Sequence, residues 1–449
     1  MSVKLQNISR SNTFFKRFFS TIIRLCRSSI SPMFLAGCLF VGSIYALGYL
    51  SNIWVENIYL RPGMVAAMGV NPMFDTFQGS ILQKEAFQDP KILPLYGSSE
   101  MTYINNFQPA KIFTPETGFT PFLVGKGGSQ TLIHVLNIAS LGEEIRGRKL
   151  AIFLTPQWYG PGGIPQSTFE GNFSPLHAYE MLRDPKLSSI LKQEIAKRLL
   201  QFSGAYKDFP CLKKILAAAA KPSWSSKMTR IIFAFPAQME YAALSYQDAA
   251  NTVRHVKELP VKTVSRYAGS AKLQKEATSS GLTTEKSQTM IQGDTQASLL
   301  DWVKIRAEAI EEGKKSSNNN PFGMDNNFYL QHIAPNVQEQ KNSDKNAKLF
   351  PSPEYEDLSL LMKILKEKGA QPLFVIIPMN GRWSDYTGFS RTERQACYQR
   401  LAQMIQAEGF KVSDFTAHEN DEYYLRDPWH LAWKGWVDVD EVLDQFYRE

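Results

Sequence analysis

The chain has 449 residues, of which 43% are apolar and 21% are charged, a composition typical of a folded protein. Residues 1–29 contain six Lys or Arg residues and no Asp or Glu, so this segment carries six of the net +7 charges. The rest of the chain carries only about +1, which argues against a nucleic-acid-binding face. We therefore expect no nucleic acid among its partners.

An uncharged stretch of 21 residues, 30–50, follows the basic tail. A helix rises about 1.5 Å per residue, so about 20 apolar residues cross the ~30 Å hydrocarbon layer of a bilayer. We predict a single transmembrane helix here, with residues 1–29 as a cytoplasmic tail and the chain beyond residue 51 outside the cytoplasm. A cleaved signal peptide is the alternative, because Ala46-Leu47-Gly48 has the small-x-small pattern of a cleavage site.

Four cysteines are distributed along the chain. Cys26 lies in the basic tail and Cys38 in the predicted membrane helix, which leaves Cys211 and Cys397 on the outside. These two residues either form one disulfide or remain as isolated thiols, and the sequence leaves both possibilities open. No metal-ligand spacing is present, so we predict no metal site.

From residue 91 onward, apolar strand-like runs alternate with helical patterns, as is typical of a mostly parallel sheet flanked by helices. The sequence predicts an α/β domain over 91–449, with residues 51–90 as a linker and domain entry. Strands are predicted at 91–97, 119–125, 149–155, 372–378 and 410–415.

Helix signals separate these strands. A helix is predicted in 129–145, where apolar residues recur at helical spacing. A second one opens at Ser352-Pro353 with acidic residues near its first turn and closes at Gly369. Ser390 and Glu393 form a capping box for a third helix, which ends at Gly409.

The pattern changes between about 200 and 350, which we interpret as a largely helical insertion into the α/β domain. Residues 269–298 are polar, with few large apolar side chains, and are predicted to form a lid, a long loop or irregular helices. An amphipathic helix follows, with Leu299 and Leu300 near its start.

Ser99 is the candidate nucleophile. It lies in Gly97-Ser98-Ser99-Glu100, directly after the first predicted strand, and reactive residues of open α/β sheets gather at the carboxyl ends of strands. An ordinary turn that caps a helix would have the same sequence.

A nucleophilic serine needs a base, and His430 is the best placed of six histidines. Asp427 precedes it by three residues in a predicted loop, so a short turn can bring the carboxylate onto one ring nitrogen and leave the other free for the serine proton. A surface turn with an unpaired histidine is the alternative.

Two further strand ends offer hydrogen-bond donors for an oxyanion. The glycine-rich turn within 124–131 can direct backbone N–H groups into a cavity, and Gln157 and Trp158 follow the third strand. The turn lacks the spacing of a nucleotide-binding P-loop, so we expect no nucleotide and no other cofactor. Trp158, Trp383 and Trp429 belong to a set of tryptophans that either line a shielded, sugar-stacking mouth or pack in the core.

The order of these blocks resembles the SGNH (GDSL-like) hydrolase superfamily, whose fold is a sandwich with helices around a mostly parallel sheet. Two departures are present: Gly97-Ser98-Ser99-Glu100 replaces the usual G-D-S-L, and Gln157 replaces the expected asparagine. With the N-terminal apolar segment, these departures are similar to the DltD family, as are "YGSSE", "GKGGSQ", "TPQW", "NNPFG", "NGRWSDYTG" and "LRDPWHLAWKGW".

The resemblance implies Ser99 as nucleophile, His430 as base, Asp427 as its orienting group and Gly128 as the oxyanion glycine. It also implies a role in the D-alanylation of lipoteichoic acid or a related envelope polymer. The expected partners are a membrane-bound O-acyltransferase, a D-alanyl carrier protein and the lipid bilayer. In this scheme Ser99 accepts the D-alanyl group and passes it to a polymer hydroxyl.

Two alternatives to a transferase remain at the level of sequence. The same triad would serve an O-acetylesterase or a thioesterase, in which water removes the acyl group. The second alternative is a non-catalytic anchored scaffold that recruits a polymer or enzyme through the insertion. A binding module, however, has no need of the ordered sequence blocks.

Overall fold

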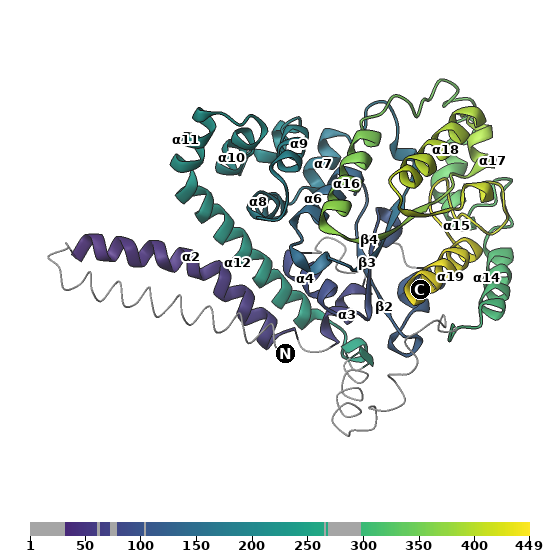
Figure 1. The fold of residues 1–449 in the computed structure, drawn as a ribbon. Helices are drawn as coiled ribbons and strands as arrows, with labels where there is room; N and C mark the ends of the chain where they lie inside the picture. The colour runs from purple at the N-terminus through teal and green to yellow at the C-terminus, as the bar shows by residue number, and fades with distance from the viewer. Residues whose placement is uncertain (1–31, 61–62, 72–78, 103–104, 265, 268–297) are drawn as a thin grey trace.

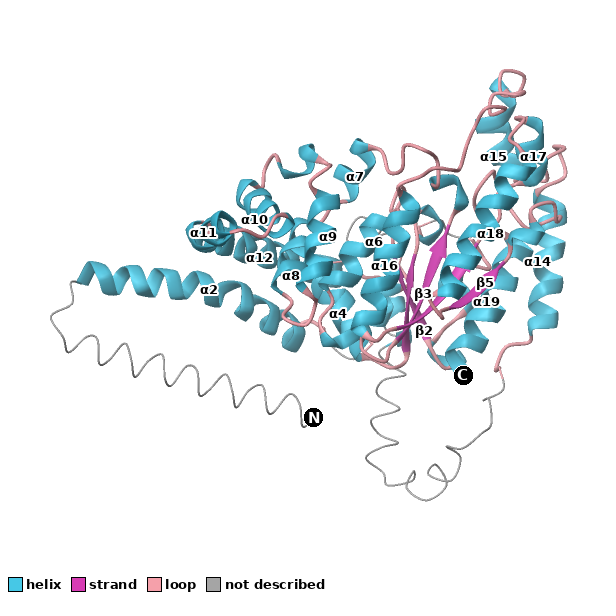
Figure 2. Ribbon diagram, turned by 45° about the horizontal axis from the view of Figure 1, so that its top comes forward, coloured by secondary structure: helices cyan, strands magenta, loops and turns pink. Residues whose placement is uncertain are grey.

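The computed structural model describes residues 32–60, 63–71, 79–102, 105–264, 266–267 and 298–449 (Figure 1). The basic tail and nearly all of the polar stretch 269–298 lie outside these residues. A five-stranded sheet runs through the centre of the domain, and helices cover both of its faces (Figures 1 and 2).

All five strands run parallel, in the order β2-β1-β3-β4-β5. The strands are β1 (Ile92–Tyr96), β2 (Thr120–Val124), β3 (Lys149–Leu154), β4 (Gln371–Ile376) and β5 (Lys411–Asp414). Four of them lie within segments predicted as strands, and β4 begins one residue before its predicted segment, at Gln371, so the predicted parallel α/β sheet is confirmed. The strand order puts β1 between β2 and β3, so their carboxyl ends are neighbours at one edge of the sheet.

Successive residues of the central strands point to opposite faces, and each face has its own apolar core. Tyr96 and Ile152 face one core, which also contains side chains of α4, α6 and α16. Leu95 and Phe153 face the other, which is filled mainly by α19. Because both faces are buried, these strands are continuously apolar and not alternating.

The helices lie on both sides of the sheet and, beyond one edge, form a separate helical layer (Figures 1 and 2). In chain order they are α2 (Pro32–Ile58), α3 (Met64–Gly69), α4 (Ser80–Gln88), α5 (Pro109–Ile112), α6 (Thr131–Ser140), α7 (Gln166–Asn172), α8 (Pro175–Arg183), α9 (Ser189–Leu199), α10 (Pro210–Ala220), α11 (Trp224–Ile232), α12 (Ala234–Glu258), α14 (Trp302–Ser316), α15 (Asn326–Phe328), α16 (Glu354–Lys368), α17 (Gly381–Tyr386), α18 (Arg391–Ala407) and α19 (Trp433–Arg448).

The predicted helix ends agree with the structure where capping chemistry defined them. Helix α16 ends at Gly369, whose φ of 66° is favourable for glycine, and the Ser390 side chain accepts the N–H of Glu393 at the start of α18. The predicted amphipathic helix after the polar stretch is also present. Helix α14 begins at Trp302 with Asp301 as its cap, so Leu299 and Leu300 precede it.

The described residues between β3 and β4 contain helices and turns and no strand. This region includes the predicted insertion, whose helices α10, α11 and α12 belong to the layer beyond the sheet (Figure 1). The segment 51–90 contributes more than a linker, because Met68 of α3 and Leu82 of α4 are buried in the same core as Tyr96.

Residues 32–50 of the predicted transmembrane segment lie in α2, which packs beside α12 (Figure 1). Val55 of α2 is buried with Ile81 and Ala249 where these helices meet the domain. Within the part of the chain that the structure describes, no helix is long and apolar enough to span a bilayer. The membrane-spanning role of residues 30–50 therefore remains a prediction.

The thiols of Cys211 and Cys397 are both free, so the structure contains no bridge between them. Burial raises the pKa of each thiol to about 11. Both are therefore protonated near neutral pH, which suits a structural thiol better than a reactive one.

Candidate active site

Ser99 lies directly beyond the carboxyl end of β1, where it opens a short 3-10 helix, η2 (Ser99–Met101). Its Oγ atom lies 2.6 Å from Nε2 of His430, a residue 331 positions later in the chain. The contact forms because the loop that follows β5, an edge strand of the sheet, reaches the turn after β1. The two residues that the sequence singled out as nucleophile and base are therefore hydrogen-bonded.

The His430 ring is held from its other side by Asp427. Nδ1 of His430 lies 2.8 Å from Oδ2 of Asp427, while Oδ1 accepts the backbone N–H groups of Trp429 and His430, each at 2.9 Å. With Nδ1 donating its proton to this carboxylate, Nε2 is the nitrogen that accepts the Ser99 hydroxyl. The Asp-x-x-His turn thus fixes both the orientation and the tautomer of the ring.

The pKa values of Asp427 and His430 are shifted by this arrangement. Burial alone would raise the pKa of Asp427, but the hydrogen bond and charge of His430 and two backbone N–H groups outweigh it, so this pKa is lowered. Burial alone would lower the pKa of His430, but Asp427, with a smaller contribution from Glu100, raises it above the usual value. The site is therefore suited to stabilise the protonated ring of His430.

Glu100 is a neighbour to which the sequence analysis assigned no role. It is buried, and its carboxylate accepts the backbone N–H of Ser98 at 2.7 Å. Burial raises its pKa, although the Ser98 N–H and His430 oppose the shift. The bond ties the turn that carries Ser99 to a side chain within the same turn. The only signal in the sequence was its position next to Ser99.

Glycines allow the turn after β2 to approach the turn after β1. An added Cβ at Gly125, whose φ is +148°, would lie 2.0 Å from the carbonyl oxygen of Gly97. At Gly128, with φ of +81°, it would lie 2.4 Å from Cγ2 of Thr168. Only glycine fits these two positions without moving the backbone.

The predicted oxyanion donors flank Ser99 on the two neighbouring strands. The backbone N–H of Gly128 donates to Oγ of Ser98 at 3.1 Å, so in this structure it is bonded to the serine next to the nucleophile. Gln157 lies in a 3-10 helix, η5 (Pro156–Trp158), at the carboxyl end of β3, and is partly buried. Their turns therefore follow the two strands that pair with β1, one on each side of it.

The three tryptophans occupy different environments. Trp158, at the carboxyl end of β3, and Trp429, in the Asp427 turn, are both partly buried. Trp383 is only 6% exposed and packs edge-to-face on Phe322, with ring centroids 5.0 Å apart. Because a core ring has no open face for a ligand, we leave Trp383 out of the substrate-binding set proposed below.

Asn380 connects three segments that the sequence showed only as separate motifs. Its backbone N–H donates to the carbonyl of Pro428 at 2.9 Å, and its side-chain Nδ2 donates to the carbonyl of Phe322 at 3.1 Å. Its Oδ1 accepts the N–H of Trp383 at 3.0 Å, which caps α17. Asn380 thereby fastens the turn that contains Asp427 and His430 to the end of β4.

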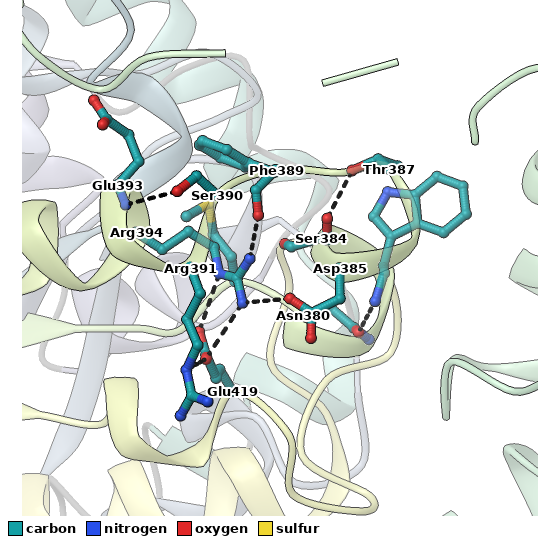
Figure 3. A network of polar contacts seen from close by, with 12 residues as sticks. Asn380, Ser384, Asp385, Thr387, Phe389, Ser390, Arg391, Glu393, Arg394 and Glu419 are labelled. Carbon is teal, nitrogen blue, oxygen red and sulfur yellow. Dashed lines mark hydrogen bonds and ion pairs between the residues drawn. The ribbon is translucent and has the colours of Figure 1, made fainter. Parts of the chain in front are cut away.

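A buried ion-pair network lies next to Asn380 and the start of α17 (Figure 3). The fully buried guanidinium of Arg394 donates to both carboxylate oxygens of Glu419 and, at 2.9 Å, to Asp385. The backbone carbonyl of Glu419 in turn accepts the N–H of Gly381 at 2.7 Å. The network joins α18, α17 and the segment after β5, and the adjacent Asn380 connects α17 to the histidine loop through the Pro428 carbonyl.

Comparison with known proteins identifies the family. The family model of the DltD protein matches residues 70–448. This chain belongs to the DltD family. The match includes the whole candidate site, from Ser99 to His430.

Three curated DltD proteins are similar to this chain over most of its length. Protein DltD of Bacillus subtilis (strain 168) is 32% identical over 434 residues, covering 96% of this chain and 98% of the relative. Protein DltD of Staphylococcus aureus (strain NCTC 8325 / PS 47) is 28% identical, with 82% of this chain and 83% of the relative covered. Protein DltD of Lacticaseibacillus rhamnosus is 26% identical, with 83% of this chain and 81% of the relative covered.

Proposed function

We propose that this DltD-family chain is a membrane-anchored, extracytoplasmic serine acyltransferase or esterase that takes a D-alanyl group onto Ser99. The acceptor would be a hydroxyl of lipoteichoic acid or of a related envelope polymer. One observation carries the proposal: the continuous hydrogen-bonded series from Oγ of Ser99 through the His430 ring to the buried Asp427 carboxylate. Membership of the DltD family supports the choice of D-alanine as the acyl group.

The chemistry proceeds in two balanced half-reactions. As Oγ of Ser99 attacks the donor carbonyl, Nε2 of His430 takes the hydroxyl proton and then gives it to the leaving group, so that an acyl ester forms on Ser99. An acceptor hydroxyl next gives its proton to Nε2 and attacks this ester, and Nε2 returns that proton to Ser99. Asp427 stabilises the imidazolium in both halves.

The oxyanion of each tetrahedral intermediate would be stabilised by the Gly128 N–H and the Gln157 amide. Since the Gly128 N–H donates to Oγ of Ser98, this bond must be exchanged for one to the oxyanion during the reaction. Trp158 and Trp429 are the aromatic residues that we assign to the substrate mouth. We also propose a membrane-bound O-acyltransferase and a D-alanyl carrier protein as the source of the acyl group.

The test is the intact mass of the purified protein after incubation with a D-alanyl thioester. We expect an adduct of one alanyl group on the peptide that contains Ser99, and no adduct in Ser99→Ala or His430→Ala. His418→Ala is the matched control, because His418 also pairs with an Asp three residues away, Asp421, but is more exposed and lies in a separate pair. An adduct that is equally abundant in Ser99→Ala would contradict the proposal.

The fate of the adduct separates a transferase from an esterase. If the adduct persists in water and is lost when a polyol-phosphate acceptor is added, the chain is a transferase. Loss at the same rate without an acceptor identifies an esterase. Normal acylation of the envelope polymer in cells that carry Ser99→Ala would favour a non-catalytic scaffold.

A further inference from the structure

Helix α11 presents an apolar stripe to the outside of the molecule. Trp224, Ile231 and Ile232 are 76%, 67% and 64% exposed, and Met228 is also exposed. Met228, Ile231 and Ile232 follow Trp224 by four, seven and eight residues, which puts all four side chains on one side of the helix. No side chain of this helix is buried.

The stripe points away from the protein, in contrast to an ordinary surface helix. The half-buried positions of α11 are Ser226 and Thr229, which lie on the opposite side of the helix. The Ser226 hydroxyl is bonded to the Ser223 hydroxyl, and Thr229 donates to the carbonyl of Ser225. An amphipathic helix on a water-exposed surface buries its apolar face, so this reversed orientation needs an apolar partner outside the domain.

The charges around the stripe identify the partner. Residues 210–232, which span α10 and α11, contain five Lys or Arg residues and no Asp or Glu. Lys213, Lys214, Lys221 and Lys227 are exposed, and Arg230 is exposed while it donates to the carbonyl of Ala218. Basic residues around an exposed Trp and Ile stripe are the composition of a helix that lies in the interface of an anionic membrane.

The place of α11 in the molecule agrees with this partner. In Figures 1 and 2, α11 lies at the same end of the molecule as α2, far from the sheet, and α2 extends beyond it. Residues 30–50 of that segment are predicted to enter the bilayer. A membrane that received the N-terminal part of α2 would therefore have its surface beside α11.

We propose that α11 is an interfacial membrane-binding helix, which inserts Trp224, Ile231 and Ile232 among the acyl chains of an anionic bilayer while the surrounding lysines contact its headgroups. This second contact with the membrane would fix the orientation of the domain about α2. The inference does not depend on the catalytic proposal.

Quenching by brominated lipid tests the proposal. The full chain is reconstituted in vesicles of phosphatidylcholine and phosphatidylglycerol. The lipids carry bromine either near the headgroup end or near the terminal end of the acyl chains. Tryptophan fluorescence is then measured on the vesicles recovered by flotation. We expect most of the tryptophan fluorescence that is quenched in the wild type to be missing in Trp224→Phe. In the wild type, bromine near the headgroup end should quench more strongly than bromine near the terminal end. Trp302→Phe is the control, because Trp302 lies on α14, on the other side of the sheet (Figure 1).

Two variants extend the test. Ile231→Ser combined with Ile232→Ser should remove the quenching of Trp224 without unfolding the protein, because both side chains are exposed. Changing Lys214, Lys221 and Lys227 to Gln should reduce quenching several-fold in anionic vesicles. Equal quenching in wild type and Trp224→Phe would overturn the proposal. Protection of Trp224 from solvent only in native membranes that contain other proteins would also overturn the proposal. That result would assign the stripe to a protein partner.

Discussion

At the scale of single residues, Asp427 decides how His430 behaves. The carboxylate is 2% exposed, accepts two backbone N–H groups and lies against Nδ1 of the ring. A buried carboxylate in this position stabilises the protonated ring, and the pKa of His430 is raised as a result. The pH dependence of the proposed acyl transfer should report this interaction.

We predict that activity depends on neutral His430 and falls as the pH decreases through its raised pKa, with a midpoint above the usual ~6.5. Asp427→Asn removes the carboxylate that raises this pKa, so the acidic limb should move to lower pH. The maximal rate should also fall by about 10⁴-fold, the cost of the equivalent change in a serine protease triad. The measurement is the pH–rate profile of ester or thioester turnover.

Asp421→Asn is the matched control for this prediction. Asp421 accepts from Nδ1 of His418 at 2.9 Å, but this pair is more exposed and lies outside the candidate site. The variant should have the profile of the wild type. A profile that shifts equally in Asp421→Asn and Asp427→Asn would mean that general charge, and not the Ser99–His430–Asp427 series, controls the pH dependence.

At the scale of secondary-structure elements, Arg394 connects several segments near the site. It connects α18 to α17 through Asp385 and to the segment after β5 through Glu419 (Figure 3). Removing one partner of a buried pair leaves the other as an uncompensated charge. Breaking such a pair costs about 3–5 kcal/mol, far more than the loss of a surface ion pair.

We therefore predict that Arg394→Leu lowers the free energy of unfolding by about 3–5 kcal/mol, measured by urea denaturation. Arg391→Leu should change it by less than about 1 kcal/mol, because Arg391 is 74% exposed and lies 3.9 Å from the same Glu419 carboxylate. The double variant Arg394→Leu/Glu419→Leu should recover part of the loss. Equal effects of the two arginine substitutions would contradict this view of the network.

At the scale of the whole molecule, the contact between α2 and α12 determines how the N-terminal helix is held against the domain. Val55 and Ala249 are buried together with Ile81 of α4. The contact is close because Ala249 is small. A larger side chain there would push the two helices apart, and overpacking of this kind costs about 1–3 kcal/mol.

Ala249→Leu should therefore increase hydrogen exchange in the C-terminal turns of α2 while the exchange of the central sheet stays unchanged. Ala250→Leu is the control, since the neighbouring Ala250 is exposed. Unchanged exchange of α2 in Ala249→Leu would show that this contact does not hold the helix.

Much of the fold was predictable because its signals are local. The strands are short apolar runs that end in turn residues, and their alternation with capped helices predicts a parallel sheet without any knowledge of distant contacts. Gly369 and the Ser390–Glu393 cap were predictable for the same reason, since capping depends only on neighbours along the chain. Ser99, His430 and Asp427 could be proposed because each follows a strand or belongs to a short motif.

The sequence by itself therefore determined the parallel α/β class, the capped helix ends and the Asp-x-x-His turn, because these depend on neighbouring residues. Only the tertiary structure decided that β1 lies between β2 and β3, that Ser99 contacts a histidine 331 positions away, that Asn380 joins three motifs, and that the apolar face of α11 points outward. Those features depend on how distant segments pack, and the periodicity of a helix reveals an apolar face without revealing what that face will meet.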